Sequence, residues 1–360
     1  MEFSKEARKN FTKHLSAWHA NENDRDLPWK GEKDPYKIWL SEVILQQTRA
    51  LQGLPYYLNF TNTYPTVQDL AAANDDEVFR IWQGLGYYNR CKNMLGTARL
   101  ITTTMNGLFP DTYEGLLELK GIGPYTAAAI ASFAFGRPNA VVDGNVYRVL
   151  SRYFGIDTPF DTTTGKRQFA ELAQDLLDNK NSAAYNQAIM DLGATVCTPS
   201  APKCTDCPLK RECFATAQGL TAALPVKSKK IVIKNRWFNY FFLLHNEEVW
   251  IEKRGSGDIW ENLHQPYLIL TEGETEIAAL SKTLNNNEIH FKSDKITYKG
   301  KLNQRLTHQQ IYTNIYTIHL ETKPVIQSDN GTWLSINELK KIAFPKTLVS
   351  FLKNNYLLLR

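Results

Sequence analysis

Four of the five cysteines in this 360-residue chain lie within a stretch of seventeen residues. They are separated by six, two and five residues, at Cys197, Cys204, Cys207 and Cys213. Four thiolates at this spacing are typical of a tetrahedral zinc site or of a [4Fe–4S] cluster. Zinc sites usually combine two closely spaced ligand pairs across a longer gap, and this chain has a single CxxC pair. The pattern therefore favours the iron–sulfur cluster.

Disulfide bonds are the alternative use of these cysteines. Residues 1–10 are charged and no apolar run approaches the length that crosses a membrane, so we expect neither a secretory signal nor a membrane partner. A reducing cytosol is the expected compartment, and it keeps thiols free for metal binding. The isolated Cys91 is expected to be a packing residue.

Two carboxylates have neighbourhoods suited to acid–base chemistry. At helical spacing, Glu42 is surrounded by apolar residues such as Ile38, Trp39 and Leu45. Burial there would raise its pKa and keep it protonated near neutral pH, as a general acid requires. The simpler alternative is a glutamate that reaches solvent from the edge of the apolar face. Asp143 is expected to cap the helix that follows it, which would also hold its carboxylate rigidly.

The segment 119–127, Leu-Lys-Gly-Ile-Gly-Pro-Tyr-Thr-Ala, is typical of a helix-hairpin-helix element. Gly121 and Gly123 permit a tight turn and a close approach to a ligand, and Pro124 suits the first turn of a helix. Free backbone N–H groups at such a helix start favour an anion, and a DNA phosphate fits. The alternative is an ordinary Gly-Pro turn between two helices.

Length and charge limit the possible classes of protein. A chain of 360 residues exceeds what one hydrophobic core usually organises, so we expect two or three domains. The net charge of +5 permits a nucleic-acid partner without requiring one. Its distribution is more informative, because residues 215–246 contain no acidic side chain. The same stretch carries five basic residues, Lys227, Lys229, Lys230, Lys234 and Arg236.

The elements that must position these residues divide at the basic stretch. Before it, 3.6-residue periodicity predicts an all-α region. Its helices are expected at 36–48, 67–73, 76–83, 90–105, 113–119, 125–135, 146–154, 166–178 and 185–192. After it, alternating and β-branched runs predict an α+β region. Its strands are expected at 237–244, 249–253, 289–299 and 311–320, and its helices at 275–284 and 336–342.

Taken together, the cysteine spacing, the hairpin with Asp143 downstream and the segment 39–48, Trp-Leu-Ser-Glu-Val-Ile-Leu-Gln-Gln-Thr, resemble adenine DNA glycosylases of the MutY type. These belong to the helix-hairpin-helix-Gly-Pro-Asp superfamily of base-excision enzymes. The resemblance implies double-stranded DNA with adenine opposite 8-oxoguanine or guanine as substrate, and a [4Fe–4S] cluster as cofactor. It also implies a monomer in the cytoplasm, associated with a bacterial nucleoid.

The resemblance also implies a domain map. Residues 1–218 would form the catalytic region, in which about 28–133 make a six-helix barrel with the hairpin. About 1–27 and 134–218 would make the iron–sulfur domain. Residues 219–233 would be a basic linker, and 234–360 would form a Nudix-like domain that recognises 8-oxoguanine.

In the family mechanism, Glu42 would protonate N7 of a flipped adenine, and Asp143 would stabilise or trap the oxocarbenium-like sugar. Tyr125 and Asn145 would orient these two groups. The adenine pocket would be lined by Arg25, Leu27, Trp29, Lys30, Gln187 and Met190. Lys30 departs from the family's more usual arginine.

Recognition of the opposite base would use a second set of residues. By resemblance, Gln47 fills the gap left by adenine, and Thr48, Leu85 and Tyr87 pack around the orphan purine. Thr307 and His308 would read 8-oxoguanine from the C-terminal domain. That domain departs from the family at Leu306, where phenylalanine is usual, and at 260–263, Trp-Glu-Asn-Leu. It also lacks the glutamate-rich helix that binds magnesium in working Nudix hydrolases, so nucleotide hydrolysis is not expected.

Tyr125 separates two possible activities within the superfamily. Relatives that also cut the strand, resembling endonuclease III, carry a Schiff-base lysine at this position, and tyrosine forms no imine. A monofunctional glycosylase is therefore expected. The alternatives are a bifunctional glycosylase/lyase acting on oxidised pyrimidines and a catalytically silent mismatch-binding module. The presence of both Glu42 and Asp143 argues against the silent module.

Overall fold

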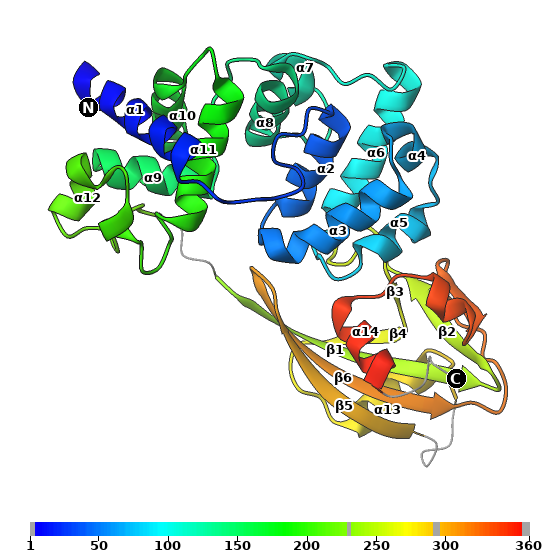
Figure 1. Ribbon diagram of the computed structural model, residues 1–360. Helices are drawn as coiled ribbons and strands as arrows, with labels where there is room; N and C mark the ends of the chain where they lie inside the picture. The colour runs from blue at the N-terminus through cyan, green and yellow to red at the C-terminus, as the bar shows by residue number, and fades with distance from the viewer. Residues whose placement is uncertain (1–3, 229–231, 291–295, 355–360) are drawn as a thin grey trace. The chain divides into compact units, whose positions relative to one another are not determined.

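The structure is a computed structural model that describes residues 4–228, 232–290 and 296–354. By their contacts the residues form two compact units, Met1–Ala71 with Asn93–Lys229, and Ala72–Lys92 with Lys230–Arg360. The first unit is helical and the second is built on a β-sheet (Figure 1). The predicted combination of an all-α and an α+β region is confirmed. The predicted boundaries at residues 218 and 233 stay predictions.

Several helices of the first unit begin after a side chain that accepts a hydrogen bond from a free backbone N–H group. Asp34 accepts from Tyr36 N at 2.9 Å, and Thr162 accepts from Gly165 N at 3.0 Å. The helices that lie wholly or partly in this unit are α1 (Lys5–Asn21), α2 (Pro35–Leu45), α3 (Ala50–Thr63), α4 (Val67–Ala72), α6 (Tyr88–Thr104), α7 (Tyr113–Leu117), α8 (Pro124–Phe135), α9 (Gly144–Phe154), α10 (Thr163–Leu176), α11 (Ser182–Thr195) and α12 (Phe214–Ala217).

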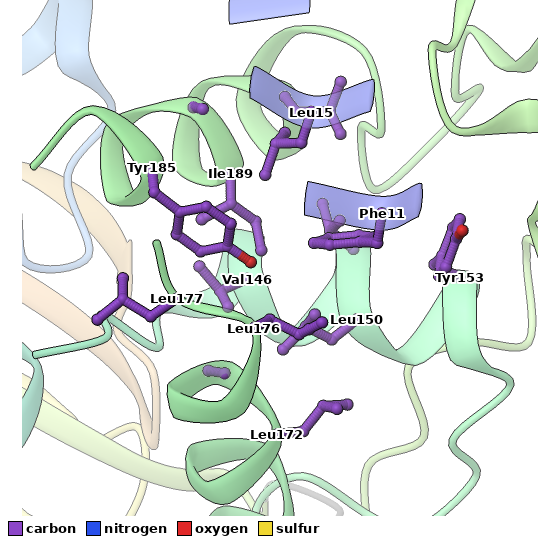
Figure 2. Packing of buried hydrophobic residues seen from close by; sticks show 14 of the residues in the cluster. Phe11, Leu15, Val146, Leu150, Tyr153, Leu172, Leu176, Leu177, Tyr185 and Ile189 are labelled. Carbon is purple, nitrogen blue, oxygen red and sulfur yellow. The ribbon is translucent and has the colours of Figure 1, made fainter. Parts of the chain in front are cut away.

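One core of the first unit joins helices from both ends of its sequence. Figure 2 shows Phe11 and Leu15 of α1 packed over Leu150 of α9, beside Tyr185 and Ile189 of α11. Leucines of α10 complete the cluster from below (Figure 2). This packing fixes the starts of α9 and α11 relative to each other, and both helices carry predicted site residues.

Helix α2 is buried on almost every side. Eight of its eleven residues are buried, including Glu42 in the middle of the helix. It packs against α8, where the run Ala127–Ala131 consists of small or aliphatic side chains and allows the two helices to approach closely. A carboxyl group on α2 is therefore poorly solvated whichever way it points.

The second unit contains a seven-stranded sheet centred on β1 (Lys234–His245). β1 runs parallel to β6 (Gln309–His319) and antiparallel to its hairpin partner β2 (Glu248–Lys253). The remaining strands pair with these three, as β3 (His264–Gln265), β4 (Tyr267–Thr271), β5 (Ile296–Arg305) and β7 (Gly331–Ser335).

Alternation along β1 creates two cores, one on each face of the sheet. Phe242 stacks on Phe351 of α14 (Lys346–Asn354), with ring centroids 5.8 Å apart. The preceding residue of the strand, Phe241, lies in the opposite core with residues of α13 (Ile277–Asn286). Helix α5 (Asp75–Trp82) also belongs to this unit, where Asp76 pairs with Lys253 at 3.1 Å.

Several predicted elements were wrong or missed. Of the predicted strand 289–299, Ile289 and His290 are not in a strand, residues 291–295 lie outside the described residues, and the residues from Ile296 on belong to β5. The predicted helix 336–342 is a single 3₁₀ turn at Glu338–Lys341. The predicted helix 36–48 ends at Leu45, so Gln47 and Thr48 follow it in a turn. The α-helices and strands without a prediction are α1, α3, α12, α14, β3, β4 and β7.

Two helical glycines provide a test of this packing. A Cβ at Gly165, near the start of α10, would lie 2.1 Å from the backbone oxygen of Pro159. A Cβ at Gly96, in α6, would meet nothing within 4 Å. We expect Gly165→Ala to lower the free energy of unfolding by roughly 1–3 kcal/mol through overpacking. Gly96→Ala should raise it by roughly 0.5–1 kcal/mol through helix propensity. Urea unfolding of both variants measures this, and equal stability of the two would contradict the close approach at Pro159.

Candidate active site

A cavity of about 1270 Å³ opens in the first unit between the loop that precedes α2 and the starts of α8 and α9. Helix α11 completes its wall. The predicted site residues that line it are Arg25, Leu27, Trp29, Lys30, Glu42, Gln47, Thr48, Tyr125, Asp143, Asn145, Gln187 and Met190. Both predicted catalytic carboxylates and all six predicted pocket residues therefore share one cavity.

Glu42 is only 6% exposed, as its apolar neighbours predicted. The pKa of Glu42 is raised to about 7, mainly by burial; a hydrogen bond from the Tyr125 hydroxyl opposes this rise, and the nearby Asp143 carboxylate contributes to it. The same hydrogen bond and burial hold the pKa of Tyr125 well above its usual range. Near neutral pH, Glu42 is thus divided between its acid and its carboxylate form.

Asp143 is the N-cap of α9, as predicted. Its Oδ1 accepts from the backbone N–H groups of Asn145 and Val146, each at 2.8 Å, and its Oδ2 accepts from Asn145 Nδ2 at 2.7 Å. Burial raises the pKa of Asp143, and these hydrogen bonds oppose the rise. Three donors hold one carboxylate in a single orientation beside Glu42.

Arg148, which the sequence analysis did not single out, fixes Asn145 in turn. Its Nη2 donates to Asn145 Oδ1 at 2.8 Å and to Gly193 O at 2.6 Å, and its Nε donates to Cys197 O at 2.6 Å. A Cβ at Gly193 would lie 2.6 Å from that of Asn145, so only glycine lets α11 approach α9 this closely. An arginine one helical turn after a capping aspartate was the available sequence signal.

A second residue that the sequence analysis did not predict, Asp191, fixes the positions of side chains in the cavity wall formed by α11. Asp191 is fully buried and accepts from Arg25 Nη1 at 2.6 Å and Gln187 Nε2 at 3.0 Å. Lys30 Nζ lies 3.4 Å from its Oδ2 and donates to Arg25 O at 2.8 Å. Asp191 is the single charged residue of α11 and lies four positions after Gln187, and this was the signal that could have identified it.

The hairpin precedes α8 as predicted. Gly123 is the N-cap of α8 and Pro124 its first residue, and no side chain caps the helix. Gly121 has φ +84°, in the left-handed region that favours glycine. Both glycines are exposed, so the free N–H groups at this helix start are open to an anion.

The residues predicted to read the opposite base fall in both units. Gln47, with φ 57°, is exposed at the cavity. In the second unit Leu85 is buried, whereas Tyr87 is 46% exposed and its hydroxyl lies 2.6 Å from Thr307 Oγ1. Thr307 and the exposed His308 occupy the turn between β5 and β6. Leu306, where the family's phenylalanine was expected, packs against one core of the sheet.

The four clustered cysteines form no disulfide bond, and Cys91 is buried as a packing residue. Cys207 lies within electrostatic range of the other three thiols, and burial raises its pKa to about 12. Arg152 Nη1 donates to Cys197 Sγ at 3.4 Å and to Thr198 O at 2.8 Å. Within the described residues, no three Cys, His, Asp or Glu side chains are gathered closely enough for a single metal ion.

No helix among the described residues combines the length and the apolar character that crossing a membrane requires.

Comparisons with known proteins identify a family for each of the two parts of the chain. Residues 40–175 match the helix-hairpin-helix-GPD superfamily of base excision DNA repair proteins, and residues 239–354 match the NUDIX domain. The adenine DNA glycosylase of Buchnera aphidicola from Acyrthosiphon pisum is 30% identical over 346 residues, which cover 96% of this chain and 97% of that protein. The human adenine DNA glycosylase is 43% identical over 214 residues, which cover 57% and 39% of the two chains.

Among solved structures, a thermostable thymine-DNA glycosylase matches with a TM-score of 0.55 and 29% identity. The match covers 59% of this chain and 98% of that one. The resemblance inferred from the cysteines, the hairpin and the Glu42 segment is confirmed. Since the Buchnera relative aligns over nearly the whole length of both proteins, the chain belongs to the adenine DNA glycosylase family.

Proposed function

We propose that this protein removes adenine from duplex DNA in which adenine stands opposite 8-oxoguanine or guanine, by hydrolysis of the N-glycosidic bond. The observation that carries the proposal is the pairing of Glu42 and Asp143 in one cavity, with the pKa of Glu42 raised to about 7 by burial. An acid of this pKa is available at neutral pH to protonate a leaving base.

The base must leave the duplex before its glycosidic bond can be reached. The cavity takes the flipped adenine, and the protonated carboxyl of Glu42 delivers a proton to N7. Protonation turns the departing adenine into a neutral leaving group. The Tyr125 hydroxyl, which donates to Glu42, holds the carboxyl in place for this step.

Loss of adenine leaves positive charge on the sugar. Asp143 stabilises this charge as a rigid carboxylate, or bonds to the anomeric carbon until water completes hydrolysis, as in retaining glycosidases. Its three hydrogen bonds from Asn145 and Val146 keep it ionised and oriented. Little reorganisation is then needed as the charge develops.

The reaction stops at base removal. Tyr125 stands where a lyase would need a lysine, and the two lysines that line the cavity are already bound. Lys30 pairs with Asp191, and Lys33 Nζ donates to Phe133 O at 3.0 Å. The charged, hydrogen-bonded amines are poor nucleophiles, which disfavours the bifunctional glycosylase/lyase.

In the second unit, Tyr87 and Thr307 supply a hydroxyl pair for recognition of 8-oxoguanine. Their 2.6 Å hydrogen bond joins two exposed residues that are 220 positions apart in the chain. His308 is proposed to contact the oxidised base, and Gln47 is proposed to fill the gap that the flipped adenine leaves. Leu306 is partly buried against one core of the sheet and is not expected to act as a wedge.

The four cysteines are proposed to hold a [4Fe–4S] cluster. Cys207 lies within electrostatic range of the other three thiols, and the four thiolates would supply the ligands that a [4Fe–4S] cluster needs. With the cysteines holding the cluster, the loop between them would be ordered and would present Lys210 and Arg211 to DNA. Arg148 connects this loop to Asn145 through the carbonyl oxygen of Cys197. We expect a monomer acting on chromosomal DNA in the cytoplasm.

The first test is single-turnover excision from duplexes with adenine opposite 8-oxoguanine, guanine or thymine. We expect adenine release opposite the two guanines, strand scission only after alkali, and no product trapped by borohydride. Glu42→Gln should lower the rate at least 100-fold because the general acid is lost. The exposed Glu171→Gln is the matched control. Scission without alkali would promote the lyase, and binding without release would promote the silent module.

The pKa of Glu42 also predicts how stability depends on pH. Below about pH 4.5 the carboxyl is protonated in both the folded and the unfolded state. As pH rises towards 7 the unfolded state ionises first, so the raised pKa costs the folded state up to roughly 3 kcal/mol. Glu42→Gln should therefore unfold at higher temperature than the wild type at pH 8 and at the same temperature at pH 4.5. Identical differences at both pH values would show that Glu42 is not buried as a carboxyl.

The hairpin provides a separate test of DNA binding. An alanine Cβ at Gly123 would meet no protein atom within 4 Å, and the φ of −92° suits alanine. Gly123→Ala should thus leave thermal stability unchanged but weaken duplex binding about tenfold, because the added methyl blocks the approach of a phosphate. Gly96→Ala is the control. If Gly123→Ala binds the duplex with unchanged affinity in fluorescence anisotropy, the hairpin does not contact DNA.

A further inference from the structure

Asp191 organises the polar wall of the cavity although it is not among the residues that the family resemblance assigned. Its carboxylate is fully buried on α11 and receives hydrogen bonds from Arg25, Gln187 and Asn23, the last at 2.8 Å. Lys30 adds a charge partner at 3.4 Å. Of these five side chains, Arg25, Lys30 and Gln187 line the cavity.

The chemistry of this contact decides which way the Gln187 amide faces. An ionised carboxylate has no hydrogen to donate, so it can bond only the NH₂ group of a glutamine. Gln187 Nε2 accordingly donates to Asp191 Oδ1 at 3.0 Å. The carbonyl oxygen lies on the other branch of the planar amide and is left to the cavity as an acceptor.

Lys30 provides a donor beside this acceptor. Two of the three ammonium hydrogens are used by Arg25 O and Asp191, which leaves one for a ligand. Adenine presents a matching pair along its Watson–Crick edge, with the N6 amino group as donor and N1 as acceptor. Hypoxanthine presents the opposite pair, because its O6 accepts and its N1–H donates.

We propose that Asp191 is a specificity-determining positioning residue, which fixes Gln187 as an acceptor and Lys30 as a donor and so selects adenine over 6-oxopurines. The proposal rests on the proposed function, since it requires adenine to enter this cavity. Asp191 itself touches no substrate and acts through Gln187 and Lys30. A 6-oxopurine would place its O6 against the Gln187 carbonyl, and a buried acceptor facing an acceptor is strongly unfavourable.

The test compares single-turnover rate constants for adenine and hypoxanthine, each opposite 8-oxoguanine. Asp191→Asn keeps the shape but adds an NH₂ group, so the Gln187 amide is free to turn over. We expect the adenine-to-hypoxanthine ratio to fall at least tenfold. A single-turnover rate constant reports only the active molecules, so partial misfolding does not affect the ratio. Asp175→Asn is the matched control, because Asp175 lies on α10 as an exposed ion-pair partner of Arg8.

A swapped pair separates positioning from a general loss of structure. In the double variant Asp191→Asn with Gln187→Glu, the new amide donates to the new carboxylate, and residue 187 again presents an acceptor to the cavity. This variant should recover the ratio. Gln187→Leu should lower the adenine-to-hypoxanthine ratio even though Asp191 is unchanged. Adding Asp191→Asn to Gln187→Leu should lower the ratio no further.

Two failures can be told apart. If the wild-type protein releases no adenine, the proposed function falls. If it releases adenine but Asp191→Asn leaves the ratio unchanged, or if the swapped pair stays as unselective as the single variant, the role of Asp191 is wrong and the glycosylase proposal stands.

Discussion

The arrangement of the first unit depends on burying one ionisable side chain, Glu42, on helix α2, which has almost no solvent-facing side. Burial of Glu42 on α2 raises its pKa to about 7. This raised pKa lowers the stability of the folded state near neutral pH, but it provides a carboxylic acid at that pH. Close packing of α2 on the alanine-rich α8 creates this environment. The same packing brings Tyr125, near the start of α8, to the carboxyl.

The two carboxylates at this site are kept different by their partners. Burial raises the pKa of both carboxyl groups. Glu42 accepts a hydrogen bond from one hydroxyl and its pKa reaches about 7, whereas three N–H groups at the first turn of α9 donate to Asp143 and oppose the rise of its pKa. Pairs of acids with opposed environments are the arrangement that divides acid and base roles in glycosidases. The capping position supplies this difference at no extra structural cost, because a helix start needs an acceptor in any case.

Sequence reasoning succeeded where the cause is local. The apolar neighbours of Glu42, the cap at Asp143 and the Gly-Pro start of α8 all follow from residues within one or two helical turns. Helix α3 was missed because Gly53 and Pro55 interrupt its pattern, although Gly53 is what allows contact with α2. Helix α1 was missed because only Phe11, Leu15 and Trp18 are buried in a polar sequence.

Contacts between distant segments were not accessible in this way. Asp191 lies 166 positions from Arg25, and Tyr87 lies 220 from Thr307, so no local pattern reveals either pair. Predicted strand ends in the second unit failed for a related reason, since pairing across the sheet decides where β5 begins. The family resemblance assigned Tyr87 and Thr307 to one site before the structure did, but it did not identify Asp191.

The dimensions of the cavity explain why polar groups rather than shape must select the base. At about 1270 Å³ it is larger than the roughly 300–1,000 Å³ of common ligand pockets, so it cannot exclude one purine from another by fit. Size differences of one small group change rates only modestly, whereas an unmatched buried hydrogen-bonding group changes them by orders of magnitude. Such discrimination works only if the wall groups cannot rotate to suit the wrong base. A fully buried carboxylate that accepts from several wall residues at once imposes that restriction.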